Sequence, residues 1–293
     1  MSIAAFDLYT ILCYGFLFGA VLLLWAPLQK VVRWETAFLG ALFFGVLSTH
    51  VEWMGVGVIV GLAGCIYITY QKSLPCWIRF LSGTAAFFLG SAIGFHQIPG
   101  FSNLKVLNAV YLSPDAVPFT MYLNFDKVSL GLMILGFTPL LVQNNKWRDL
   151  FKRTFLKAFF VIVMIAGLSY GMGFVTWDFK VPDSLWIWAL TNLLFVCVAE
   201  EAFFRGFVQR NLFIFLENTA FRSFGAIVIA GLVFGGFHYY GGVQYMILSA
   251  IAGMGYGWIY QTTGRIEASI LTHFSLNLIH FLCFTYPALK TVF

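Results

Sequence analysis

Six polar residues interrupt the apolar C-terminal third of this sequence at spacings that suit acid–base chemistry. They are Glu200, Glu201 and Arg205 in one apolar stretch, His238 in a second, and His273 and Asn277 in a third. Ionisable groups at membrane depth are costly, so each one is a candidate functional residue. A carboxylate near an imidazole can take up a proton and return it later. The residue types therefore indicate a catalytic site as the working hypothesis.

The spacing of the first group assigns different tasks to its two glutamates. Adjacent residues of a helix point about 100° apart, so Glu200 and Glu201 cannot aim at one spot. Glu201 and Arg205 are four residues apart and share a helix face, where an ion pair would hold the helix. Glu200 is then left for acid–base work. The alternative is that these three charges mark a solvated helix end.

The histidines strengthen the catalytic interpretation. His238 follows Phe234 by one turn in AGLVFGGFHYY, where glycines permit close approach of helices. His273 precedes Asn277 by one turn in ILTHFSLN, and His280, seven residues further on, we expect to be structural. A single histidine in an apolar helix is usually a hydrogen-bonded core residue. Two of them together with an intramembrane glutamate favour a site.

Composition defines the elements that must position these residues. Of 293 residues, 60% are apolar and only 10% are charged, which excludes a soluble globule and predicts an all-α, polytopic membrane bundle. The net charge of +5 lies in short connectors, so no nucleic-acid partner is expected. The five cysteines show no CxxC spacing and therefore predict neither a disulfide framework nor a zinc knuckle.

A span needs about 20 apolar residues, and the sequence predicts roughly eight to ten of them. The candidate stretches are 8–26, 36–49, 54–70, 77–95, 127–143, 157–177, 185–204, 224–240, 243–261 and 268–286. We expect residues 1–180 to form N-terminal spans and residues 181–293 to form the catalytic core. The connector 96–126, with three prolines, is the one long loop and has room for a short surface helix.

The distribution of basic residues predicts the orientation of the chain. Twelve of the seventeen fall on one side of a ten-span arrangement, which the positive-inside rule makes cytoplasmic. They are Lys30, Arg33, Lys72, Arg79, Lys146, Arg148, Lys152, Arg153, Lys157, Arg210, Arg222 and Arg265. Both termini are then expected outside the cytoplasm.

Depth provides a geometric check on whether the polar residues can meet. At about 1.5 Å per residue, Glu200 lies about 15 Å from Arg210 and His273 about 10 Å from Ile266. His238 lies about 22 Å from Ser223, which is too deep for a common layer. The three can meet only if the helix carrying His238 starts late or is tilted.

The three motifs together resemble those of a known family. EEAFFR at 200–205, FGGFH at 234–238 and HFSLN at 273–277 are similar to the EExxxR, FxxxH and HxxxN motifs of the CAAX-processing and bacteriocin-processing (CPBP) intramembrane proteases, of the Ras-converting, glutamic type. TTGRIEAS at 262–269 resembles the Thr-Gly turn that often precedes the last motif. The resemblance covers about residues 185–285 and implies a helical catalytic core.

That resemblance also implies roles for individual residues. Glu200 and His238 would activate a water molecule, while His273 and Asn277 would stabilise the oxyanion. Arg205 and Glu201 would hold the catalytic helix, with Phe234 as a further supporting residue. The implied reaction is hydrolysis of a peptide bond in a membrane-anchored or lipidated peptide or protein, inside the bilayer. The protein would be a multi-pass component of the cell (inner) membrane.

Three alternatives remain open at this stage. Glu200, His238 and His273 could hold zinc, although the sequence has no HExxH and a metal-free, glutamic-type mechanism without any cofactor is favoured. A non-catalytic scaffold or immunity protein could use the same fold, but would ordinarily have lost one of the four polar positions. A transporter would need polar intramembrane residues in the first half of the chain as well.

Overall fold

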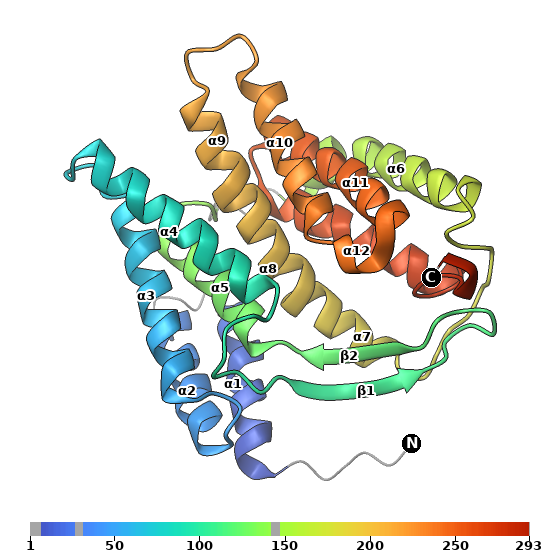
Figure 1. Ribbon diagram of the computed structural model, residues 1–293, viewed down its shortest axis with the longest axis horizontal. Coiled ribbons are helices and arrows are strands. Elements are labelled where there is room, and N and C mark those ends of the chain that lie inside the picture. The colour runs from blue at the N-terminus through green and yellow to red at the C-terminus, as the bar shows by residue number, and fades with distance from the viewer. Residues whose placement is uncertain (1–6, 27–31, 142–146, 293) are drawn as a thin grey trace. The chain divides into compact units, whose positions relative to one another are not determined.

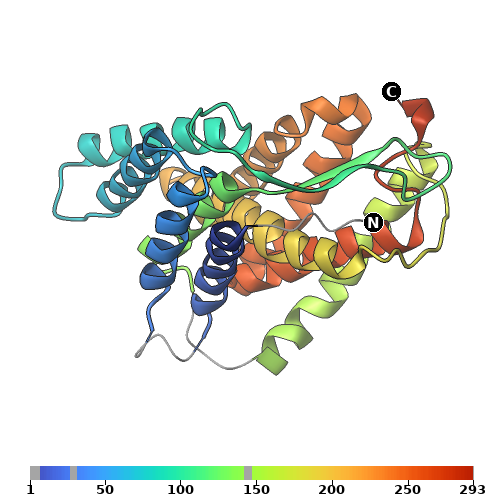
Figure 2. The ribbon, with the colours of Figure 1, turned by 90° about the horizontal axis from the view of Figure 1, so that it is seen from below.

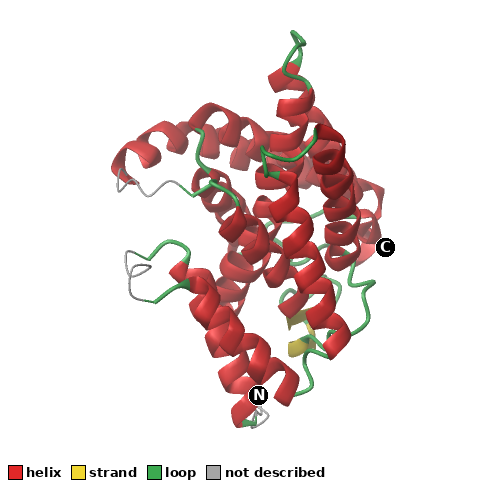
Figure 3. Ribbon diagram, turned by 90° about the vertical axis from the view of Figure 1, so that its left-hand side faces the viewer, coloured by secondary structure: helices red, strands yellow, loops and turns green. Residues whose placement is uncertain are grey.

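The computed structural model describes residues 7–26, 32–141 and 147–292, and these are mostly helical (Figure 3). Each of the ten apolar stretches predicted from the sequence contains a helix. The α-helices are α1 (Leu8–Leu23), α2 (Trp34–Leu47), α3 (Trp53–Thr69), α4 (Cys76–Gly94), α5 (Phe125–Phe137), α6 (Trp147–Gly171), α7 (Leu185–Thr191), α8 (Val198–Glu201), α9 (Arg210–Phe215), α10 (Arg222–Gly236), α11 (Gly242–Thr263) and α12 (Ile266–Cys283). The prediction of a helical protein is confirmed.

Four described helical segments are long and apolar enough to cross a membrane, or five if the bent pair α10 and α11 counts as one span. They are Cys76–Gly94, Trp147–Gly171, Leu185–Phe215 and Ile266–Cys283. Helices α1, α2 and α3 are apolar but shorter, and α5 has 13 residues, nearly all of them buried. The expected eight to ten spans are therefore not confirmed, because hydropathy alone does not reveal where an apolar helix ends or whether it lies inside the protein.

The chain divides into two compact units. Unit 1 comprises residues 1–104 and 122–143, and unit 2 comprises residues 105–121 and 144–293. In unit 1, α1 packs against α2, α3 packs against α4, and α5 contacts α1, α3 and α4 (Figure 1). The many buried residues of α5 follow from this position among three helices.

Polar side chains tie the loops at one end of unit 1. Nδ1 of His96 lies 2.6 Å from Oδ2 of Asp126, which also accepts a hydrogen bond from Asn103 through Oδ1. His50 lies 2.7 Å from the carbonyl oxygen of Ser102 through Nδ1. Both histidines, for which the sequence offered no partner, thus fasten connectors between helices.

Unit 2 contains the motif helices and also α6. Helix α6, which the sequence placed with the N-terminal spans, packs against α11 and α12. The segment from Leu185 to Phe215 is one long helix of 31 residues that contacts α10 and α12 (Figure 1). The contacts therefore divide the chain before α6 rather than at the expected boundary near residue 180.

The long connector 96–126 contains a β-hairpin and not the short surface helix that the sequence allowed. Strands β1 (Leu104–Val110) and β2 (Phe119–Leu123) pair with each other. The two strands run side by side (Figure 2). Within unit 2, Leu107 and Met121 pack with Trp188, Phe281 and Tyr286, so the hairpin buries one apolar face. Alternation of apolar and exposed residues suits a strand with one buried face, and this corrects the expectation of a helix.

Candidate active site

The helix that carries the first motif departs twice from α-helical geometry. The π-helical segments η2 (Asn192–Cys197) and η3 (Ala202–Gln209) flank the four residues of α8. Such wider turns change the direction in which side chains point and occur frequently at functional sites. Glu200 and Glu201 therefore lie on a short α-helical segment, α8, between two π-helical segments.

Glu201 is the centre of a buried polar cluster. Its side chain has no exposed surface, and its carboxylate accepts hydrogen bonds from Nε of Arg205 at 3.1 Å and from Nδ1 of His273 at 2.9 Å. The hydroxyl of Ser269, one turn before His273, donates to the same carboxylate. The ion pair expected between Glu201 and Arg205 is present, and Glu201 additionally joins this helix to α12.

Arg205 is fully buried among aromatic rings. Its guanidinium carbon lies 5.3 Å from the ring centre of Phe234 and 6.0 Å from that of Tyr256. Among the described residues, its two terminal nitrogens have no hydrogen-bond partner. Aromatic faces can partly stabilise such a cation. Gly257 makes room here, because a Cβ at that position would lie 2.6 Å from the side-chain oxygen of Gln209.

His238 lies in a turn between two closely packed helices. α10 ends at Gly236, and His238 precedes the short 3-10 turn Tyr239–Gly241. The helical segments on either side are bent by 60° relative to each other. Since α10 already begins at Arg222, it does not start late, and the 60° bend lies between α10 and the helical segment that follows His238.

Both histidine rings are oriented by the proton on Nδ1. Nδ1 of His238 lies 2.7 Å from the carbonyl oxygen of Phe234, and Nδ1 of His273 contacts the carboxylate of Glu201. These oxygens only accept hydrogen bonds, so Nδ1 is the donor and, in a neutral ring, Nε2 carries the lone pair. The ring of Phe234 lies between the histidines, with ring centres 4.6 Å from His238 and 5.8 Å from His273.

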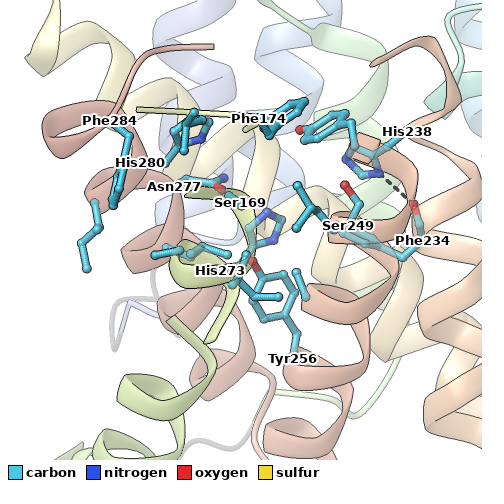
Figure 4. Close-up of a pocket in the computed structure, with 18 residues that line it drawn as sticks. Ser169, Phe174, Phe234, His238, Ser249, Tyr256, His273, Asn277, His280 and Phe284 are labelled. Carbon is cyan, nitrogen blue, oxygen red and sulfur yellow. Dashed lines mark hydrogen bonds between the residues drawn. The ribbon is translucent and has the colours of Figure 1, made fainter. Parts of the chain in front are cut away.

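One cavity in unit 2 brings together three of the four predicted catalytic residues. His273 and Asn277 from α12 face His238 across it, with Ser249 and Tyr256 from α11 along the wall (Figure 4). Its volume is about 80 Å³, and it is partly open to the surroundings. The other lining residues are Ile165, Ala166, Ser169, Phe174, Val175, Phe234, Tyr245, Leu248, Ala252, Leu276, Ile279, His280 and Phe284. The cavity is thus apolar with a few convergent polar groups, as ligand sites commonly are.

Glu200 is half-buried and is not among the lining residues. Tyr245 lines the cavity, and its ring centre lies 5.1 Å from that of His238. His280, expected to be structural, donates through Nε2 to the carbonyl oxygen of Thr285 at 3.2 Å and also lines the cavity. Of the two residues expected to activate water, His238 therefore lines the cavity and Glu200 does not.

The mouth of the cavity is bordered by a loop and the C-terminal segment. Phe174 and Phe284 line it, and the backbone of Thr285 donates to the carbonyl of Thr176 at 2.9 Å. In the same loop, burial raises the pKa of Asp178, but hydrogen bonds from Ser113 and Lys180 and the charge of Lys180 outweigh it and lower that pKa below its ordinary value. These pairings fasten the loop at neutral pH.

Sequence reasoning did not find several residues of the site. Ser269 was visible in principle, because it lies four residues before His273 on the same helix face. Tyr245 and Asn192 gave no signal of spacing, since each contacts the site from another helix. Within the described ranges no three His, Cys, Asp or Glu side chains gather as metal ligands would.

The fold and the cavity define an integral membrane protein with a buried carboxylate–imidazole site built on helices. Residues 182–279 match the family model described as type II CAAX prenyl endopeptidase Rce1-like, and this match is consistent with the CPBP intramembrane proteases. No curated protein and no solved structure matches the chain.

Proposed function

We propose that this protein is an intramembrane endopeptidase that hydrolyses a peptide bond near the lipid anchor of a membrane-bound peptide or protein. The observation that carries the proposal is the convergence of His238, His273 and Asn277 on one cavity, with both imidazoles held through Nδ1. A peptidase needs an acid–base group and oxyanion donors within reach of one carbonyl. The family match at residues 182–279 supports the same class of reaction.

In the proposed mechanism, Glu200 and His238 take the proton of a water molecule as its oxygen attacks the scissile carbonyl carbon. The carbonyl oxygen becomes an oxyanion that accepts hydrogen bonds from Asn277 and from Nε2 of His273, which donates there when the ring carries a proton on both nitrogens. The captured proton then passes to the nitrogen as the C–N bond breaks, which leaves a carboxylate and an amine. Glu201 holds His273 in place throughout.

The walls of the cavity support an apolar, lipidated substrate. Leu248, Leu276, Ile279 and Phe284 offer hydrocarbon surface beside the polar groups. The name of the matched family model, type II CAAX prenyl endopeptidase Rce1-like, indicates prenylated peptides as the substrate class. The proposed location is the cell (inner) membrane.

The test is cleavage of a prenylated peptide by the purified full-length chain in lipid nanodiscs. We expect cleavage by the wild type and a fall of about 10² to 10⁴-fold in Glu200→Gln and in His238→Ala, because each removes a proton acceptor. His50→Ala, which alters a histidine in unit 1, is the matched control and keeps its activity. A peptide of the same sequence without the lipid shows how much the lipid anchor contributes to the rate of cleavage.

Two outcomes would change the assignment. Undiminished cleavage by both site variants would contradict the mechanism, and an inactive wild type would favour a non-catalytic scaffold or immunity protein. A strong chelator separates the mechanisms: unaffected activity supports the glutamic type, and loss of activity that zinc restores identifies a metalloprotease.

A further inference from the structure

The π-helical segment η2 places two side chains together that an α-helix would separate. Residues five apart in an α-helix point about 140° away from each other. In a π-helix the hydrogen bonds run from residue i to i+5, so such residues lie one above the other. Accordingly, Sγ of Cys197 lies 3.4 Å from Oδ1 of Asn192 at the two ends of η2. Neither residue belongs to the motifs.

Both side chains contact Asn277 of α12. Nδ2 of Asn277 donates to Oδ1 of Asn192 at 3.1 Å and lies 3.7 Å from Sγ of Cys197. Cys197 has no exposed surface, and Asn277 lines the cavity. The three side chains form a closed triangle between the helix of the first motif and the helix of the third.

This triangle determines which part of the Asn277 amide meets the cavity. A carboxamide carries two N–H donors on one atom and a carbonyl acceptor on the other. A rotation of 180° about the last side-chain bond would exchange them and present an oxygen where a donor is needed. Asn192 opposes that rotation, because Oδ1 can only accept and therefore pairs with the N–H side of Asn277.

We infer that Asn192, aided by Cys197, is a positioning residue that holds the Asn277 amide with one N–H engaged and directs the other N–H to the oxyanion. This inference rests on the proposed peptidase function. Preorganised donors are worth most because they need no reorganisation during the reaction, and removal of one oxyanion donor costs about 10² to 10³-fold in rate. The π-helical segment η2 supports this role, because in a regular α-helix Cys197 would not reach Asn192.

The experiment is a kinetic double-mutant cycle on the full-length protein in nanodiscs, with the prenylated peptide as substrate. The variants are Asn192→Ala, Asn277→Ala and their combination, compared by kcat and KM. We expect Asn192→Ala to lower kcat about 10 to 100-fold with little change in KM, because the donor is lost only in the transition state. The double variant should be no slower than Asn277→Ala, because Asn192 acts through Asn277.

A conservative change separates positioning from packing. Cys197→Ser keeps a group that both donates and accepts hydrogen bonds, and we expect it to keep kcat within about threefold of the wild type, whereas Cys197→Ala loses more. Asn211→Ala is the matched control: it lies on the same long helix, and its amide donates to the carbonyl of Phe207 at 2.8 Å, away from the cavity. Its kcat should equal that of the wild type.

The outcomes distinguish this inference from the proposed function. If the wild type cleaves and Asn192→Ala retains its kcat, or if the losses of the two single variants multiply in the double variant, the positioning role is overturned and the peptidase stands. If the wild type cleaves none of the lipidated peptides, the proposed function falls and the role of Asn192 falls with it.

Discussion

Two adjacent glutamates of this protein occupy very different surroundings. Glu201 is fully buried and accepts hydrogen bonds from Arg205, His273 and Ser269, whereas Glu200 is half-buried. A buried carboxylate with three donors is part of the framework of the protein. Glu200 is partly accessible, and the proposed mechanism assigns it the acid–base role.

Substitution of the two glutamates should therefore separate stability from catalysis. In Glu201→Gln, the cationic Arg205 stays buried without its counter-charge, and we expect a loss of about 3 to 5 kcal/mol in unfolding free energy together with loss of activity. In Glu200→Gln, we expect loss of activity with a much smaller change in stability. Thermal unfolding in detergent, followed by near-UV circular dichroism, measures the difference. Equal stability of the two variants would argue against the framework role of Glu201.

Among the contacts of the site, the sequence predicted those between residues four positions apart on one helix. Glu201 and Arg205 are four residues apart, and this spacing predicted their ion pair. The same spacing between His273 and Asn277 predicted that both side chains lie on one face of their helix, and both line the cavity. The contact between Glu201 and His273 could not be predicted, because it joins residues 72 apart on different helices. Such contacts depend on how helices pack, which a single sequence does not state.

Among the helices, the pair α10 and α11 determines where His238 lies. A Cβ on Gly235 would lie 2.6 Å from both the Cβ of Ala250 and the carbonyl oxygen of Met246. A Cβ on the neighbouring Gly236 would meet nothing within 4 Å. The absence of a side chain at Gly235 therefore lets the two helices approach closely just before the turn that holds His238.

The same substitution at these adjacent glycines should have opposite effects. Gly235→Ala forces α10 away from α11, and we expect a destabilisation of about 1 to 3 kcal/mol and a displaced His238 with reduced kcat. Gly236→Ala should be neutral or slightly stabilising, because alanine has the higher helix propensity. Unfolding curves and peptide cleavage of both variants provide the measurement. Similar behaviour of the two would show that close approach of the helices does not position His238.

The elements that the sequence failed to predict are those that depart from regular periodicity. The π-helical turns η2 and η3 widen a helix whose apolar pattern reads as an ordinary span. The β-hairpin lies in a connector with prolines, where no pattern longer than a few residues is present. Both are stabilised by packing against other elements, such as Leu107 against Trp188, rather than by local preference.

For the whole molecule, the matched domain does not contain all of the cavity wall. The family model covers residues 182–279, whereas Ile165, Ala166 and Phe174 come before it and Phe284 after it. The hairpin and the C-terminal segment pair in the same unit, as the bridge between Ala116 and Leu289 shows. The compact unit that contains the cavity thus includes α6, and hydropathy could not indicate this because it does not report which helices pack together.

The orientation of the chain in the membrane remains a prediction that α4 can test. Its 19 residues are about 28 Å long, enough to place Cys76 and Gln97 on opposite sides of a bilayer. The basic residues near Cys76 predict a cytoplasmic location for that end, although Lys30 and Lys146 of the same basic set lie outside the described residues. We expect a membrane-impermeant thiol reagent to label a chain with Cys76 as its single cysteine in inside-out vesicles only. A single-cysteine chain carrying Gln97→Cys should be labelled in right-side-out vesicles only, and the reverse pattern would invert the orientation while leaving the site unaffected.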